Sequence, residues 1–142
     1  MVHISEASSI AIHMLALIAE ADSPLNVTEL TKLTNFSRNH ISKVMQILVK
    51  SGYLNSGRGP KGGFMLKMNS TRVTLLEIIE LIEGTVEEKH CRKDENGCPF
   101  EECLFGGIPE KLTREFRQYF ASTRISDVKR KSNKYQEVIL KK

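Results

Sequence analysis

The chain alternates between stretches in which apolar residues recur every three or four positions and short polar connectors. Such spacing places the apolar residues on one face, so it predicts amphipathic helices. In the first stretch the recurring residues are Ile10, Met14, Leu17, Ile18 and Ala21. We predict helices over residues 8–21, from Asn26 to about Asn35, from Ser37 to Gly52, from Thr74 to Gly84, and a last long helix beginning near Pro109.

Capping signals mark the start of three of these helices. Asn26 with Glu29, and Thr74 with Glu77, have the spacing of capping boxes, in which side chains and backbone N–H groups bond reciprocally. Ser37 is a favourable N-cap for the third helix. The second and third helices are thus joined by about three residues, which is the pattern of a helix-turn-helix.

Two short strands, YLNS (53–56) and GFML (63–66), flank the glycine-rich connector GRGPKG. A β-hairpin directly after a helix-turn-helix is a wing, and Arg58 and Lys61 at its tip are placed to reach phosphates or a minor groove. The alternative is a surface hairpin whose glycines only satisfy turn geometry. The fold class we predict is mainly α, a winged helix-turn-helix followed by a long helix that packs either on this domain's own core or on the same helix of a second subunit.

The third helix has an apolar face opposite a polar and basic one. Ile41, Val44, Met45 and Leu48 share the first face, and His40 lies near the boundary. A recognition helix needs such a polar face for contacts with DNA. The predicted DNA-binding residues are Arg38, Asn39, His40, Ser42, Lys43, Arg58 and Lys61.

Charge is distributed unevenly along the 142 residues, whose net charge is +4. From Leu30 to Leu76 there are eight basic residues and no acidic one, whereas residues 77–102 carry nine acids and three bases. From Gly107 onward, ten bases face four acids. A surface of one sign attracts a polyanion, so the acid-free stretch favours double-stranded DNA as the partner.

Composition and motifs narrow the class further. The sequence contains no run of eighteen apolar residues, so it predicts no membrane-spanning helix. The first residues, MVHISEASS, lack the basic start and the cleavage site of a signal peptide. We therefore expect a cytoplasmic protein with no membrane partner. The chain has no G-x-S-x-G, Walker or H-E-x-x-H motif, so we do not expect an enzyme.

All three cysteines lie in CRKDENGCPFEEC, at Cys91, Cys98 and Cys103. An odd count in a reducing compartment argues against a disulfide framework. Three thiolates within thirteen residues can converge on a soft metal centre, although the C-x-x-C pairs and fourth ligand of structural zinc are absent. From the residues alone, solvated cysteines or a metal-free thiol sensor are equally open.

Four segments together resemble one family. They are GYLNSGRGPKGGFML, RVTLLEIIELIEG, the cysteine segment after it, and STRISDV near residue 125. Over roughly the first 128 residues the chain resembles the Rrf2 family of bacterial winged-helix regulators. The resemblance implies a homodimer on a pseudo-palindromic operator, with the long helix crossing to the partner. It also places Arg38, Asn39, Ser42 and Lys43 on the recognition helix and Arg58 in the wing.

The resemblance further implies an iron–sulfur cluster, two-iron or four-iron, held by Cys91, Cys98 and Cys103. Some members have a histidine three residues after the last cysteine, where this chain has Gly106. Others take a ligand from the first helix of the partner subunit, where this chain offers Ser9 and His13. His13 is our tentative fourth ligand, and the competing candidates are His90, Glu101 and Glu102.

These expectations combine into three units: a DNA-binding domain over residues 1–86, a cluster-binding loop over 87–108, and a dimerisation helix with a basic tail over 109–142. The predicted function is a dimeric transcriptional regulator whose operator binding depends on the cluster. One alternative is a metal-free repressor of the same fold that responds to thiol chemistry or a small molecule. The other is a small redox or electron-transfer protein.

Overall fold

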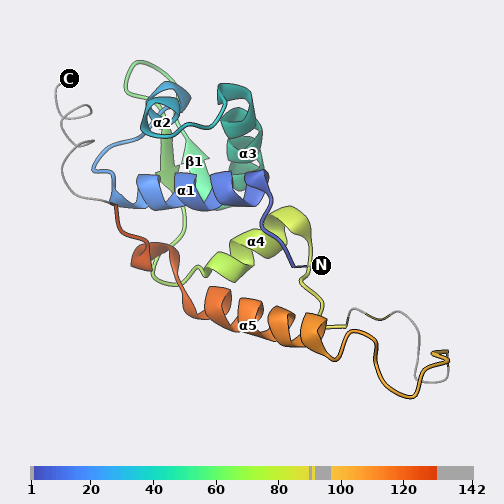
Figure 1. The fold of residues 1–142 in the computed structure, drawn as a ribbon. Coiled ribbons are helices and arrows are strands. Elements are labelled where there is room, and N and C mark those ends of the chain that lie inside the picture. The colour runs from blue at the N-terminus through green and yellow to red at the C-terminus, as the bar shows by residue number, and fades with distance from the viewer. Residues whose placement is uncertain (1, 90, 92–96, 131–142) are drawn as a thin grey trace.

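The computed structural model describes residues 2–89, 91 and 97–130 (Figure 1). Within these residues the helices lie on two sides of α1, and a two-stranded antiparallel sheet completes the fold. The winged-helix class predicted above is therefore confirmed. The elements in chain order are α1 (Glu6–Glu20), α2 (Val27–Leu33), α3 (Arg38–Lys50), β1 (Leu54–Ser56), β2 (Phe64–Leu66), α4 (Leu75–Glu83), α5 (Ile108–Ser122) and the 3₁₀ turn η1 (Ile125–Asp127).

The caps at the start of α2 and α3 are as predicted. The Asn26 side chain accepts a bond from the backbone N–H of Glu29 at 2.9 Å, and the Glu29 carboxylate accepts one from the N–H of Asn26 at 3.0 Å. The Ser37 hydroxyl accepts a bond from the N–H of His40 at 3.2 Å. These bonds satisfy N–H groups that have no partner inside their helices.

Two predicted helix boundaries are wrong. The first helix begins at Glu6 and not at Ser8, because the Ser5 hydroxyl caps it by accepting a bond from the N–H of Ser8 at 3.1 Å. The second helix ends at Leu33, and Thr34 after it is extended (φ −135°, ψ 167°). The chain therefore leaves α2 through an extended residue, before the helix end predicted near Asn35.

The predicted capping box of α4 is only half present. The Thr74 hydroxyl accepts a bond from the N–H of Glu77 at 3.1 Å. The Glu77 carboxylate, however, accepts a bond from the Tyr53 hydroxyl at 2.6 Å. Burial and this bond to Glu77 raise the pKa of Tyr53 to about 12. The carboxylate thus ties α4 to the residue before β1, a contact that no local motif specifies.

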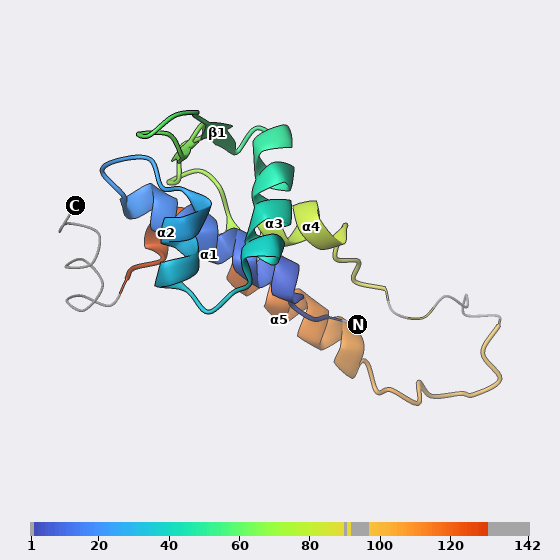
Figure 2. The same ribbon diagram turned by 90° about the horizontal axis from the view of Figure 1, so that it is seen from above.

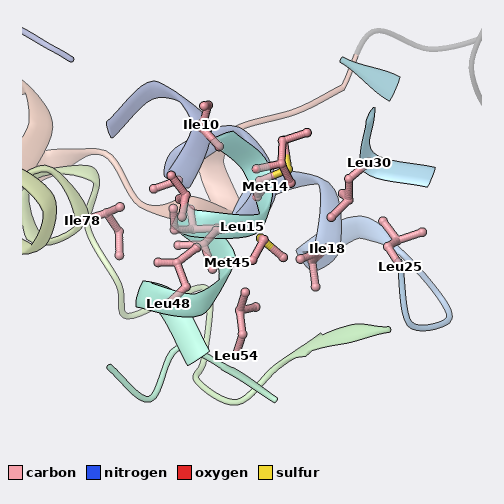
Figure 3. Packing of buried hydrophobic residues seen from close by; sticks show 14 of the residues in the cluster. Ile10, Met14, Leu15, Ile18, Leu25, Leu30, Met45, Leu48, Leu54 and Ile78 are labelled. Atoms are coloured by element: carbon pink, nitrogen blue, oxygen red, sulfur yellow. The ribbon is translucent and has the colours of Figure 1, made fainter. Parts of the chain in front are cut away.

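The hydrophobic core lies between α1, α3, the hairpin and α4 (Figure 3). Each of its central side chains is at most 1% exposed, and burying one such side chain contributes about 1.5–3 kcal/mol. The predicted inward face of α3 is confirmed. The central core residues include Ile10, Met14, Leu15, Leu30, Ile41, Met45, Leu48, Leu54, Ile78 and Ile125.

The hairpin is attached to the rest of the fold along the outer edge of β2. Its register pairs Leu54 with Leu66 and Ser56 with Phe64. Phe64 also exchanges two backbone bonds with Leu25, at 2.8 and 3.2 Å, in the connector between α1 and α2. The wing therefore has a fixed position relative to the helix-turn-helix.

The chain after α5 returns to the domain. The N–H of Ile125 bonds to the carbonyl of Val73 at 3.0 Å, and the N–H of Leu75 bonds to the carbonyl of Thr123 at 2.9 Å. Ile125 is fully buried. These contacts fix the C-terminal end of α5 beside the start of α4, and α5 runs along α4 in both views (Figures 1 and 2).

Candidate functional site

The outer face of α3 carries most of the predicted DNA-binding residues. Arg38, Asn39, His40 and Lys43 are exposed, and Ser42 is half-buried. Because the opposite face of α3 packs into the core, these side chains are held on a rigid helix. Their exposure leaves them accessible to a large partner.

Two of these side chains contact residues on other helices. The Nη1 of Arg38 donates to the Oγ1 of Thr28 on α2 at 2.9 Å. The Nδ1 of His40 lies 3.3 Å from the Oε2 of Glu6 on α1. Both partners of the His40 pair are more than half exposed, so this pair adds little to stability.

The tip of the wing is a tight glycine turn. The N–H of Gly62 bonds to the carbonyl of Gly59 at 2.9 Å, and Gly59 has a φ of +95°. A Cβ at Gly62 would lie 2.6 Å from the Gly57 carbonyl oxygen, so the two arms approach too closely for any side chain there. Arg58 and Lys61 are exposed on this turn.

The acid-free stretch forms an exposed basic surface. All eight of its lysine and arginine side chains are exposed. Figure 1 shows α3 and the hairpin loop on the same side of α1, with α4 and α5 on the other side. The helix and the hairpin that carry most of these basic residues therefore lie on the side of α1 away from α5. The eight residues are Lys32, Arg38, Lys43, Lys50, Arg58, Lys61, Lys67 and Arg72.

A carboxylate that sequence reasoning missed joins α4 to the start of α1. Glu83 accepts bonds from the N–H of Ser5 at 2.8 Å and from the hydroxyl of Ser8, which is fully buried. His3 lies 3.6 Å away. Burial disfavours the charged form of Glu83, but the hydrogen bonds from Ser8 and Ser5 outweigh it and lower its pKa below the ordinary value of 4.5.

A second carboxylate fastens α4 to α5. The Arg117 guanidinium on α5 forms an ion pair with Glu80 on α4 and also donates to the carbonyl of Val86 at 2.7 Å. The N–H of Val86 in turn donates to Glu80 at 3.0 Å. This network holds the beginning of the segment that leads to the cysteines.

The three cysteines are exposed and free of disulfides. Cys91 and Cys103 line one pocket of about 460 Å³, together with Val2 and the first turns of α5, whereas Cys98 is not among its lining residues. Among the residues that the structure describes, no three metal-binding side chains come together. Three thiols fit a soft metal centre by their chemistry, but the single chain does not assemble them into a site.

His13, the tentative fourth ligand, is exposed on α1 and is not part of that pocket. Its Nδ1 lies 2.7 Å from the carbonyl oxygen of Ser9, and its ring meets the ring of Phe36 edge-on at 5.4 Å. If Nδ1 donates to this carbonyl, Nε2 keeps the lone pair that a metal requires. Glu101 and Glu102 are exposed, and His90 lies outside the described residues.

A set of large apolar side chains lies along α5 and in the segment before it, from Phe100 to Tyr119. Each of its members is more than half exposed. Both ribbon views show the chain before α5 projecting from the rest of the molecule (Figures 1 and 2). Exposed patches of this kind mark interaction surfaces. We call this set the α5 patch; it comprises Phe100, Leu104, Phe105, Ile108, Leu112 and Tyr119.

Comparison with known proteins gives a consistent result. A family model described as "Rrf2: Iron-dependent Transcriptional regulator" matches residues 4–131. A putative HTH-type transcriptional regulator of Aquifex aeolicus is 31% identical over 122 residues, which cover 84% of this chain and 83% of that protein. The putative regulator BadM of Rhodopseudomonas palustris is 39% identical over 72 residues, 51% of this chain and 46% of BadM.

Solved structures agree on the fold. The global cysteine regulator CymR of B. subtilis has a TM-score of 0.74 at 19% identity, covering 89% of this chain and 95% of CymR. IscR of T. potens has a TM-score of 0.65 at 19% identity, covering 89% of this chain and 85% of that one. In the described part of the chain, no helix is both long and apolar enough to cross a membrane.

Proposed function

The chain belongs to the Rrf2 family of DNA-binding transcriptional regulators, and from that premise we propose that it binds a palindromic operator as a homodimer under the control of its cysteine segment. The observation that carries the proposal is the exposed basic surface of α3 and the wing. Homologues that are transcriptional regulators also weigh against the electron-transfer alternative.

In this proposal α3 enters the major groove and the wing follows the backbone. Asn39 and Ser42 carry donors and acceptors for base edges, and Lys43 neutralises phosphate. Arg58 and Lys61 extend the contact to neighbouring phosphates or a minor groove. All of these side chains except the half-buried Ser42 are exposed, and this exposure supports the assignment together with the rigid attachment of both elements.

The α5 patch supports the homodimer. The rings of Phe116 and Phe120 contact each other in a tilted arrangement with centroids 4.6 Å apart, and both are half-buried, whereas Leu112 and Tyr119 remain more than half exposed. Pairing of two copies through this patch covers an apolar surface that a single chain leaves in water. We therefore assign residues 109–142 to dimerisation, residues 1–86 to DNA binding and residues 87–108 to sensing.

For the sensing segment we propose that Cys91, Cys98 and Cys103 hold an iron–sulfur cluster, with His13 of the partner subunit as the candidate fourth ligand. The cluster is of the two-iron or four-iron type. Such a cluster supplies an electron-accepting centre whose gain or loss reports redox or iron status. The three unpaired thiols support this assignment, as does the 2.7 Å contact of the His13 Nδ1 with the Ser9 carbonyl, because donation from Nδ1 leaves the Nε2 lone pair for a metal.

The chain's own residues connect the segment to the fold at two places. Glu80, Arg117 and Val86 hold its beginning, and the start of α5 follows its end. The segment can therefore alter how α5 lies against α4, and with it the spacing of the two recognition helices in a dimer. An effector shifts this arrangement only as far as it binds the two forms differently.

A metal-free sensor is the second candidate. Cys91 and Cys103 line the same apolar pocket, which suits thiol chemistry or a small apolar ligand as well as a metal. In this version the fold, the dimer and the operator contacts are unchanged. The two candidates differ only in what the cysteine segment binds.

The deciding experiment is an absorption spectrum of anaerobically purified protein, with iron and acid-labile sulfide assayed on the same sample. Charge-transfer bands with equal iron and sulfide support the cluster. Cys98→Ser is then expected to lose them, and His13→Ala and His90→Ala test the fourth ligand. A colourless, iron-free protein after anaerobic reconstitution contradicts the cluster and favours the thiol sensor, with DNA binding retained.

A further inference from the structure

Arg38, the first residue of α3, is held by a residue outside the recognition helix. Its Nη1 donates to the Oγ1 of Thr28 on α2 at 2.9 Å, and both side chains are exposed. We infer that Thr28 is a positioning residue, which holds the Arg38 guanidinium ready to read a base edge in the operator. The inference rests on the proposed function of α3.

Thr28, near the start of α2, uses its hydroxyl differently from Thr31 and from Thr34, which directly follows the helix. The hydroxyl of Thr31 donates to the carbonyl of Val27 at 2.8 Å, and the hydroxyl of Thr34 donates to the carbonyl of Leu30 at 3.0 Å. Bonding to the carbonyl four residues earlier is the usual behaviour of a helical threonine. Thr28 is the second residue of α2, so that carbonyl precedes the helix, and its hydroxyl instead accepts from Arg38.

The chemistry of the partner matters, because a hydroxyl orients a guanidinium without neutralising it. A carboxylate would hold Arg38 more strongly but would also cancel its charge. The first turn of α3 contains no acidic residue, and the carboxylate of α2, Glu29, bonds to the N–H of Asn26. Arg38 therefore keeps its full charge and its remaining donors for an acceptor on DNA.

The position of Arg38 does not serve the stability of α3. A cation in the first turn of a helix is disfavoured by the helix dipole. In helix-turn-helix proteins, the N-terminal residues of the recognition helix are those that contact base edges. A guanidinium in this place matches the O6 and N7 acceptors of guanine, to which it can donate two bonds.

The size of the effect follows from the ordering of the side chain. A free arginine loses rotamer freedom when it binds, and a contact that already restricts it removes part of that loss. This corresponds to roughly two- to tenfold in affinity. The gain applies only to DNA that offers the matching base edge, so it appears in specificity.

The test uses the full chain and a duplex that the wild-type protein selects from a random library, with a scrambled duplex of the same composition as reference. Thr28→Val keeps the shape of the side chain and removes the hydroxyl. It is expected to lower affinity for the selected duplex two- to tenfold, with the scrambled duplex and the melting temperature unchanged. Thr28→Ser is expected to restore binding.

The matched control is Thr31→Val, which removes a hydroxyl from the same helix without touching Arg38 and is expected to leave affinity unchanged. In an Arg38→Ala background, Thr28→Val is expected to have no further effect, because the two residues act as one unit. If Thr28→Val binds the selected duplex as well as wild type while Arg38→Ala does not, Thr28 has no positioning role. If Arg38→Ala also binds normally, the proposed reading role of Arg38 itself is wrong.

Discussion

The winged-helix part of the chain and its cysteine segment differ in how their residues are held. In the first, α1, α3, α4 and the hairpin enclose side chains that are almost entirely buried, and the polar face of α3 stands on that core. In the second, every residue from 97 to 108 is exposed, including Phe100, Leu104 and Phe105.

This difference indicates which parts of the molecule are held in place by packing within a single chain. The exposed faces of α3 and the wing need nothing further to hold their shape, because α3 packs into the core and β2 is bonded to Leu25. The described part of the cysteine segment instead leaves its large apolar side chains and its thiols exposed. Exposure of this kind suits a surface that a second copy or a bound group covers, as proposed above.

The largest expected difference between the two regions is tested by a matched pair of leucine-to-alanine substitutions. Leu48 is fully buried in α3, and Leu104 is 70% exposed. We expect Leu48→Ala to lower the free energy of unfolding by about 2–5 kcal/mol, because it leaves a cavity, and Leu104→Ala to change it by less than about 0.5 kcal/mol. Urea denaturation measures both; equal losses would contradict the division into two regions.

The second prediction concerns assembly. Leu112→Glu places a charge in the middle of the α5 patch and should raise the dimer dissociation constant by about a hundredfold, roughly 3 kcal/mol, without affecting the fold of the monomer. Gln118→Glu adds the same charge at another exposed position of α5 and is the control. Analytical ultracentrifugation separates the two, and an unchanged dimer in Leu112→Glu would exclude this patch as the interface.

The third prediction sharpens the contact between α1 and α4. Glu83→Gln replaces the carboxylate that Ser5 and Ser8 bond and should lower the free energy of unfolding by about 1.5 kcal/mol near neutral pH. Glu88→Gln, at an exposed position, should not.

The pH dependence of this difference has a definite sign. The pKa of Glu83 is lower in the folded chain than its ordinary value of 4.5, so the unfolded chain binds the proton more readily. The stabilisation is therefore present above about pH 4.5 and is lost as pH falls through the folded pKa. Denaturation curves of wild type and Glu83→Gln should converge in acid; a gap that persists there would show that the charge is not its cause.

The smallest effect is expected from the wing. Removing both cations with Arg58→Ala and Lys61→Ala should weaken binding about tenfold at low salt and reduce the slope of log affinity against log salt by about two. The core is not touched, so the melting temperature should stay the same. Lys89→Ala, outside the basic surface, is the control; an equal change in its salt slope would mean that the wing makes no direct contact.

Local signals in the sequence predicted the winged-helix part of the fold well. The caps at Asn26 and Ser37, the apolar face of α3 and the glycine turn of the wing each depend on residues a few positions apart. The start of α1 was missed because Ser5 and Glu6 precede the apolar stripe. The available signal was Ser5, a favourable N-cap residue, followed by the acidic Glu6 in the first turn of the helix.

The contacts that sequence reasoning could not supply are long-range ones. Ser5 and Glu83, which are joined by a hydrogen bond, are 78 positions apart. The Glu77 carboxylate accepts a bond from the Tyr53 hydroxyl, where a complete capping box would have it accept from the N–H of Thr74. Such pairs depend on how whole helices and strands pack together, so no regular spacing of residues in the sequence indicates them. The cysteine site is a further case, because its spacing allows several chemistries and the described chain does not assemble a site that would choose among them.

The measurement that tests the central claim most directly is the affinity for the selected duplex of iron-containing and iron-free protein, prepared from one anaerobic batch. We expect both forms to bind, because the reading face is complete without the cysteine segment, and we expect their affinities to differ by about tenfold or more, as a coupling of 1–3 kcal/mol implies. Equal affinities in the two forms would contradict control of the operator by the cysteine segment.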